Sequence, residues 1–195
     1  MEVHYQRWRV RGVRGALLCL AAASGLAVAL AAHGAEPGVW QSHQMIFNYL
    51  GAEPTYSCDG LSHILQALLK QAGARLDGPI SAGPCSGGAG TPSKMLFARF
   101  KFSTLQPASA SGSDAASVPG EWKQVRFAPQ HPLNVLSGGD CELDEEFKGK
   151  VLTMFATRNM KANLQCIPFQ TTGYFFNLSF EVFVPSDAGA AAGSH

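Results

Sequence analysis

The stretch SCDGLSHILQALLKQAGARLDGPISAGPC, residues 57–85, carries a helical pattern and then an extended segment between two cysteines. A second stretch, DCELDEEFKGKVLTMFATRNMKANLQC at residues 140–166, has the same plan. In each, the first cysteine lies beside an aspartate, a leucine follows two or three residues later, and the second cysteine comes 27 or 25 positions on. This matching spacing indicates an internal duplication, although few residues are identical.

Both stretches begin with the apolar periodicity of an amphipathic helix. The apolar face of the first helix is made by Leu61, Ile64, Leu65, Leu68 and Ala72, and that of the second by Leu143, Phe147, Val151, Met154 and Phe155. Gly73 is suited to end the first helix. Asp140 is placed to cap the second helix, whose first turns are acidic, as the helix dipole favours.

Alternation of apolar and polar residues predicts strands around these helices. It is clearest in residues 95–105 and 174–184 and weaker in residues 160–166, while residues 74–85 suggest an irregular edge strand. One further strand is expected before each helix, at residues 43–50 and 121–128. The sequence therefore predicts an α+β fold. It would be a tandem β-α-β-β repeat whose mainly antiparallel sheet of about six strands carries both helices on one face.

Cysteine geometry predicts the disulfide pairing. A helix of ~14 residues rises roughly 21 Å, and a returning strand of about seven residues covers about 23 Å. Each second cysteine should therefore come back beside the start of its own helix, giving Cys58–Cys85 and Cys141–Cys166. The alternative is a reactive thiol at a helix N-terminus. We disfavour it because the chain has no C-x-x-C pair and each cysteine has a partner at matching spacing.

Residues 1–31 have the pattern of a secretory signal peptide. Four arginines between Arg7 and Arg14 precede an apolar run at residues 15–32, which contains the small-residue site Ala29-Leu30-Ala31. This predicts an exported bacterial protein, periplasmic or secreted, that is cleaved near Ala31 and meets the membrane only through this segment before cleavage. The alternative is a retained anchor, because the run approaches the ~18 residues that can span a bilayer.

The rest of the chain divides by composition. We expect a first β-α-β-β unit at residues 32–106, a flexible low-complexity loop at 107–120, a second unit at 121–185 and a disordered tail at 186–195. Cleavage after Ala31 would remove four basic residues and one acidic residue, which leaves eleven basic and thirteen acidic residues. A slightly acidic chain lacks the basic footprint of a nucleic-acid binder, so we expect no nucleic-acid partner.

No recognisable motif in the sequence predicts catalysis. The histidines of the cleaved chain lack metal-ligand spacing, and the glycine-rich residues 83–94 have no Gly-Lys-Ser/Thr ending. We therefore expect no catalytic residue, metal or cofactor, and favour a non-catalytic protein that binds a partner protein or a small ligand of the cell envelope. The alternative is a small exported enzyme, a hydrolase or a thiol-redox protein, built from scattered residues such as His131, Asp59 and Glu181.

Aromatic and basic residues recur on the strand face that should point away from the helices. If the strands pair as the repeat implies, they form a candidate binding face made of Phe97, Arg99, Lys101, Phe175 and Phe183. The plainer interpretation, which we prefer from the sequence alone, is a second, smaller apolar cluster covered by loops or by a partner.

Overall fold

The computed structural model describes residues 35–51, 56–85, 87–108, 117–129, 140–167 and 175–186. The predicted signal peptide lies outside these residues, as do most of the predicted interunit loop and of the predicted tail. In chain order the elements are β1 (Glu36–Leu50), α1 (Cys58–Gln71), β2 (Arg75–Leu76), β3 (Ser81–Gly83), β4 (Met95–Pro107), β5 (Val118–Phe127), α3 (Cys141–Lys150), the 3₁₀ turn η2 (Leu152–Met154), β6 (Thr157–Gln165) and β7 (Phe175–Pro185).

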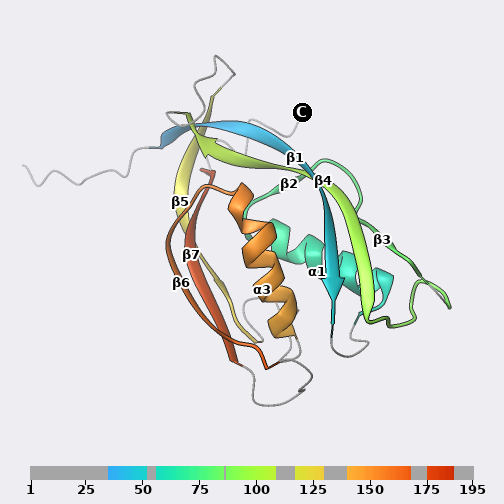
Figure 1. The fold of residues 1–195 in the computed structure, drawn as a ribbon. Coiled ribbons are helices and arrows are strands. Elements are labelled where there is room, and N and C mark those ends of the chain that lie inside the picture. Colours follow the sequence, from blue (N-terminus) through green and yellow to red (C-terminus); the bar gives the residue numbers. More distant parts are fainter. Residues whose placement is uncertain are drawn as a thin grey trace, which may run out of the picture. The chain divides into compact units, whose positions relative to one another are not determined.

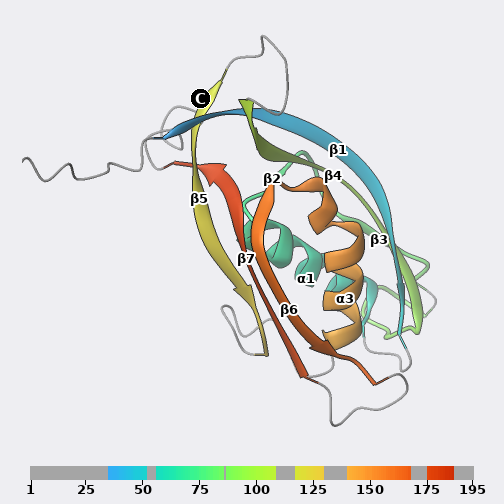
Figure 2. The same ribbon diagram turned by 60° about the vertical axis from the view of Figure 1, so that its left-hand side comes forward.

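The strands form one seven-stranded sheet in the order β2-β4-β1-β5-β7-β6, with β3 also paired to β4. Every neighbouring pair is antiparallel. The sheet is strongly bent, and α1 and α3 both lie in the space that it encloses (Figures 1 and 2). The α+β class and the mainly antiparallel sheet with two helices are confirmed, with seven strands among the described residues rather than about six.

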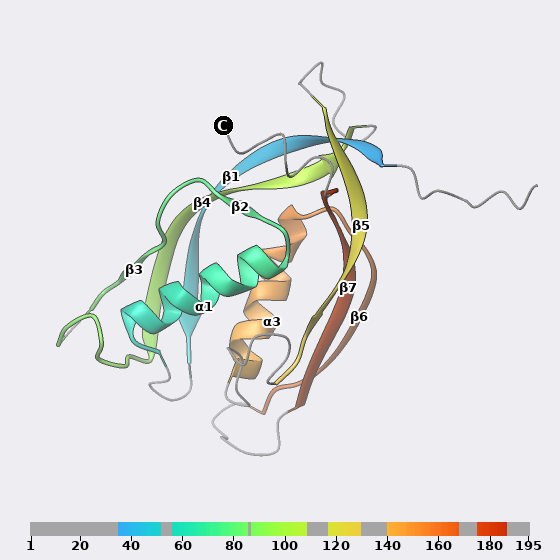
Figure 3. The same ribbon diagram turned by 180° about the vertical axis from the view of Figure 1, so that it is seen from behind.

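The two halves of the described chain use the same order of strands. In the first half β4 lies between β1 and the short edge strands β2 and β3, and in the second half β7 lies between β5 and β6. The halves meet where the start of β1 pairs with the start of β5, over three residue pairs centred on Pro37 and Pro119. Beyond this junction, β1 with β4 and β5 with β7 pass on opposite sides of the helices (Figure 3).

Helix α1 forms as its sequence predicts. Ser57 is the N-cap, and its Oγ accepts a hydrogen bond from the backbone N–H of Gly60 at 3.1 Å. The predicted apolar residues are buried in the core between helices and sheet. Gly73 ends the helix with a φ of +81°, a conformation that favours glycine. The N–H of Ala74 then closes the helix on the carbonyl of Leu69 at 2.9 Å.

Helix α3 is shorter than its apolar stripe suggests. It ends at Lys150, and the η2 turn carries the chain on, so that Leu152 and Phe155 still reach the core. Asp140 occupies the N-cap position, as predicted, but its side chain makes no capping hydrogen bond. Its carboxylate instead accepts a hydrogen bond from the Tyr56 hydroxyl. Burial beside Tyr56 thus gives the carboxylate a different partner from the one that its position in the helix suggests.

The strand at the far edge of the second half departs from the predicted alternation. Met160 and Ala162, expected to face inwards, are exposed, whereas Leu164 and Cys166 pack against the core. The pairing of β6 with β7 shifts register between Arg158 and Lys161, where Asn159 has a φ of 53°. This bulge and the edge position explain the difference, since a bulge changes the face to which the following side chains point.

The junction between the halves depends on two glycines. A Cβ atom on Gly120 would lie 2.4 Å from Cζ of Phe183, and one on Gly38 would lie 2.7 Å from Cε1 of the same ring. Both would also lie within 2.9 Å of the side chain of Leu105. The missing side chains therefore make the space that Phe183 and Leu105 fill, on the face of the sheet opposite the helices.

Each half also contains one disulfide. Cys58 is bonded to Cys85 and Cys141 to Cys166, which are the pairs that the helix-and-return geometry predicts. The Cα atoms lie 5.9 Å and 5.6 Å apart, within the usual range for a disulfide. Each bond ties the first residue of a helix to the chain that returns along the sheet.

Replacing Cys141 and Cys166 together by alanine should lower the free energy of unfolding by about 2–5 kcal/mol, because the 25-residue separation would no longer be bridged in the unfolded chain. Urea denaturation of the oxidised protein and of the variant measures the difference. Peptide mapping without reduction should show only bonds within each half among these four cysteines. An unchanged denaturation midpoint, or a bond between the halves, would contradict this account.

Gly120→Ala should lower the free energy of unfolding by about 1–3 kcal/mol, because the added methyl group overlaps the buried ring of Phe183. Gly149→Ala is the matched control, since a Cβ atom there meets nothing within 4 Å. That change lies inside α3 and should raise stability by about 0.5–1 kcal/mol. Equal effects of the two substitutions in the same denaturation experiment would argue against a packed junction.

Candidate functional site

The face of the sheet that points away from the helices is called here the outer face. In the first half, this outer face is partly uncovered. Along β4, alternate residues from Leu96 to Phe102 are buried in the core, which places Phe97, Arg99 and Lys101 on the outer face. Arg99 and Lys101 are exposed, and the guanidinium carbon of Arg99 lies 5.5 Å from the centre of the Phe97 ring. The structure therefore places three of the five residues of the predicted binding face together.

A pocket of about 390 Å³ lies beside these residues. Its walls come from Gln44, Met45 and Ile46 of β1, from residues 77–79 after β2, and from Arg99, Phe100 and Lys101 of β4. The strand register places Ile46 opposite Arg99 and Gln44 opposite Lys101, while the N–H of Asp77 bonds to the carbonyl of Lys101 at 3.0 Å. We call this the cationic pocket, after its two basic side chains.

Exposed apolar side chains continue along the outer face from this pocket. Ile46 is 53% exposed, Leu50 69% and Met95 63%. Leu50 pairs with Met95, and Asn48 pairs with the partly buried Phe97, so these side chains lie along two adjacent strands. Ile46, Leu50, Met95 and Phe97 are called the apolar stripe below.

The other two residues of the predicted binding face do not join this surface. Phe183 is 1% exposed and fills the junction beside Gly38 and Gly120, so its assignment to a binding face is wrong. Phe175 is 47% exposed, but β7 is separated from β4 by β1 and β5, so it belongs to a different part of the sheet. For Phe183, the preferred sequence interpretation of a second small apolar cluster is the better description.

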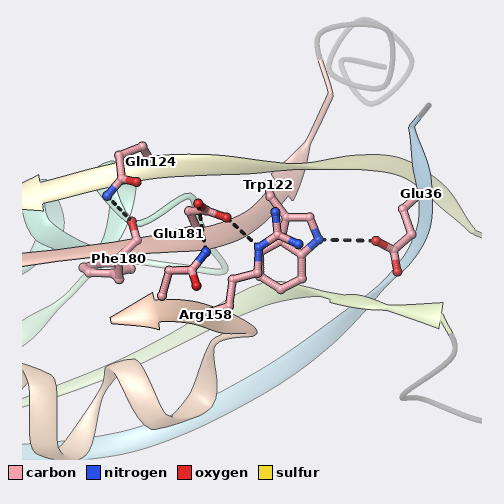
Figure 4. A network of polar contacts seen from close by, with 7 residues as sticks. Glu36, Trp122, Gln124, Arg158, Phe180 and Glu181 are labelled. Carbon is pink, nitrogen blue, oxygen red and sulfur yellow. Dashed lines mark hydrogen bonds and ion pairs between the residues drawn. The ribbon is translucent and has the colours of Figure 1, made fainter. Parts of the chain in front are cut away.

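On the outer face of the second half, polar and aromatic side chains satisfy one another (Figure 4). The Trp122 indole donates to Glu36 at 3.3 Å, packs on Phe183, and has the Arg158 guanidinium 4.2 Å above its ring. Arg158 also binds Glu181 at 2.5 Å. Hydrogen bonds from Arg158 and Asn159 hold the pKa of Glu181 below its ordinary value. These groups are occupied with one another, which leaves them poorly placed for a ligand.

A related cluster surrounds Trp40 in the first half. The Arg75 guanidinium lies 4.7 Å from the centre of the Trp40 ring, and its Nε is 3.4 Å from Asp77. The other carboxylate oxygen of Asp77 accepts a hydrogen bond of 2.6 Å from Ser103. This cluster positions residue 77 at the wall of the cationic pocket.

The start of α3 contains a buried carboxyl group. Asp144 is fully buried, and neither of its oxygens has a hydrogen-bond partner among the described residues. Burial, and secondarily the nearby charge of Asp140, raise the pKa of Asp144 to about 8. This group is neutral near pH 7, because an uncompensated charge in an apolar core is costly.

The residues suggested for an enzyme do not come together among those described. Asp59 lies in the first turn of α1, inside the bent sheet, whereas Glu181 is on the outer face and bonded to Arg158. His131 lies outside the described residues. The four cysteines of the described chain are all in disulfides, which leaves no free thiol in this part of the protein.

Neither the described histidines nor the acidic residues form a metal centre. His43 hydrogen-bonds to Thr104 at 2.9 Å and stacks against Phe102, and burial lowers its pKa. Within the described ranges, no three His, Cys, Asp or Glu side chains are grouped to hold a metal ion.

Sequence reasoning missed part of this site and the whole junction. Gln44, Ile46 and Asp77 could not be assigned to one pocket, because only the strand register brings them beside Arg99 and Lys101. The junction, by contrast, left a signal in the sequence. Pro-Gly-x-Trp occurs at residues 37–40 and again at 119–122, and each copy stands at the start of a strand.

Comparison with known proteins finds no matching family model, no matching curated protein and no matching solved structure. In the part of the chain that the structure describes, no helix is both long and apolar enough to span a bilayer. The functional inferences below therefore rest on the residues and geometry described above.

The raised pKa of Asp144 predicts a pH-dependent stability. Between about pH 4 and pH 8 the unfolded chain is ionised at this residue and the folded chain is not, so the free energy of unfolding falls as pH rises. Asp144→Asn should flatten this fall by about 1.4 kcal/mol per pH unit and stabilise the protein at pH 7. Urea denaturation from pH 4 to 8 measures the slope.

Asp59→Asn is the matched control, because the same substitution at the start of the other helix alters an exposed side chain and leaves the core unchanged. A slope that is the same in the wild-type protein and in Asp144→Asn would show that Asp144 is ionised in the folded state.

Proposed function

We propose that this chain is an exported, non-catalytic protein of the bacterial cell envelope that binds a partner or a ligand through the outer face of β1 and β4. The observation that carries the proposal is the cationic pocket of about 390 Å³, with Arg99 and Lys101 exposed at its wall. Its volume is in the range usual for ligand sites. Ile46 connects it to the apolar stripe, so polar and apolar contacts are available side by side.

Export is supported by two independent features. The N-terminal 31 residues have the charge and apolar pattern of a cleaved signal peptide. The two disulfides fit an oxidising, exported environment such as the periplasm, where such bonds form and persist.

We also propose that the fold arose by duplication of a β-α-β-β unit. Residues 37–40 and 119–122 share Pro-Gly-x-Trp, and the strand register places Leu105 opposite the first tryptophan and Phe183 opposite the second. Each half has its own disulfide from a helix start to the returning chain, and an arginine over its tryptophan. Matching positions that differ between the halves then indicate where one copy has specialised.

The sequence allowed two interpretations of this face, a small apolar cluster that is covered and a face that binds a partner or ligand. They apply to different parts of the outer face. Phe183 is covered within the chain, at the junction. Three of the four side chains of the apolar stripe are exposed, and a run of exposed apolar side chains on a folded protein is typical of an interaction surface. The stripe and the cationic pocket are therefore the part of the face that we assign to binding.

Photo-cross-linking in the native host tests this function. Phe97 is replaced by a benzoylphenylalanine, which is close in shape and forms a covalent bond with whatever lies beside it on illumination. A discrete adduct should form in the envelope fraction and should be lost when Arg99 and Lys101 are also changed to alanine. Electrophoresis followed by mass spectrometry detects the adduct and its mass.

Phe175 gives the matched control, because it is an exposed phenylalanine on the corresponding strand of the other half. The same replacement there should give no adduct of that mass. The proposed function fails if position 97 gives no adduct in the envelope, or if its adduct is unaffected by the loss of Arg99 and Lys101.

A further inference from the structure

We propose that the cationic pocket binds the phosphate or carboxylate head of an anionic amphiphile, with the apolar chain of that amphiphile lying along the apolar stripe. This inference rests on the proposed function, because it names the ligand class of the same site.

The basic side chains at the pocket do not form ion pairs with acidic side chains among the described residues. Arg99 and Lys101 are two residues apart on one strand, so both project to the outer face and their Cα atoms lie about 6–7 Å apart. Neither forms an ion pair with any described residue, whereas Arg75, Lys150 and Arg158 each do. Two like charges this close repel each other, and an anion between them would relieve that repulsion.

The one carboxylate in the wall does not cancel this preference. Asp77 accepts a hydrogen bond from Ser103 through one oxygen and faces Arg75 through the other. Both of its oxygens therefore already have partners, one of them a cation. Gln44, opposite Lys101 in the register, adds an amide that can donate to an anionic oxygen.

The apolar stripe determines what must be attached to the anion. From Arg99 back to Met95 is four residues along the strand, or about 13 Å. Ile46, Phe97, Leu50 and Met95 present apolar surface over this distance. A small hydrophilic anion would leave that surface in water, whereas an alkyl chain would cover it and gain free energy from its burial.

The second half lacks this combination at the matching positions. Leu105 and Phe183 are at matching positions, because each pairs with the tryptophan of its own half. Six residues before them, Arg99 corresponds to Asn177, and four residues before them, Lys101 corresponds to Ser179. Asn177 accepts a hydrogen bond of 2.9 Å from Arg126, which occupies the place of Gln44. The second half thus satisfies its polar groups internally, and the first half keeps two cations available on the same framework.

Isothermal titration of the exported, oxidised protein tests the ligand class with three probes. Dodecyl phosphate, kept below its micelle concentration, should bind at one site. Inorganic phosphate should bind at least about tenfold more weakly, because it covers no apolar surface. Dodecyl maltoside, which has the same chain and no charge, should also bind at least about tenfold more weakly. Added salt should weaken the binding of dodecyl phosphate.

The variant with Arg99→Ala and Lys101→Ala should lose at least about tenfold in affinity for dodecyl phosphate. Lys123→Ala with Lys161→Ala is the matched control, because it removes the same charge from exposed positions in the second half and should change affinity less than about twofold. Unchanged circular dichroism and melting temperature confirm that both double variants are folded, as expected for exposed side chains.

Sedimentation with phosphatidylglycerol vesicles, compared with phosphatidylcholine vesicles, distinguishes the source of the head group. Binding to phosphatidylglycerol vesicles that requires Arg99 and Lys101 assigns the site to lipid in a bilayer, and binding of dodecyl phosphate alone assigns it to a free amphiphile. Equal affinity for dodecyl phosphate and dodecyl maltoside, no binding of either, or an unaltered affinity in the variant would overturn the inference. If the photo-adduct at position 97 still forms in that case, the proposed function stands and only the ligand class is wrong.

Discussion

The close contact at the junction of β1 and β5 is the constraint on which the rest of the structure depends. Among the described residues, three backbone pairs between β1 and β5 join the two halves of the sheet, and the ring of Phe183 fills the space that Gly38 and Gly120 leave open. Because the strands separate beyond this point, the sheet bends around both helices and their apolar faces share one core. The disulfides act within each half, so they stabilise the parts that the junction holds together.

This arrangement makes the two halves of the outer face unlike each other. In the second half, Trp122, Arg158 and Glu181 bind one another, and Phe183 is buried. In the first half, the same framework carries Arg99 and Lys101 without ion pairs among the described residues, next to an exposed apolar stripe. In one half of the outer face the polar groups therefore bind one another, and in the other half two basic side chains are exposed beside apolar ones.

The sequence predicts those features that depend on local periodicity and chain length. The apolar face of α1 follows from its periodicity and its end from Gly73, whereas the partners of Cys58 and Cys141 follow from helix rise and strand return. The sequence does not predict what packs on each face of a strand. Alternation assigns the side chains to two faces, but it does not identify the residues that each face contacts. Phe183 and Phe97 both fall on outward-facing positions of their alternating patterns, yet Phe183 is buried, because Gly38 and Gly120 on two other strands leave room for its ring. The edge bulge in β6 and the acceptor role of Asp140 depend likewise on contacts made far along the chain.

Nuclear Overhauser spectroscopy of the protein labelled at phenylalanine and glycine tests the junction most directly. Strong cross-peaks are expected from the ring protons of Phe183 to the α protons of both Gly38 and Gly120, which belong to strands in different halves of the chain. Cross-peaks to neither glycine, or to Gly120 alone, would mean that the halves do not meet around this ring. In that case the two halves would not form a single bent sheet. The contrast between the two halves of its outer face would then be incorrect as well.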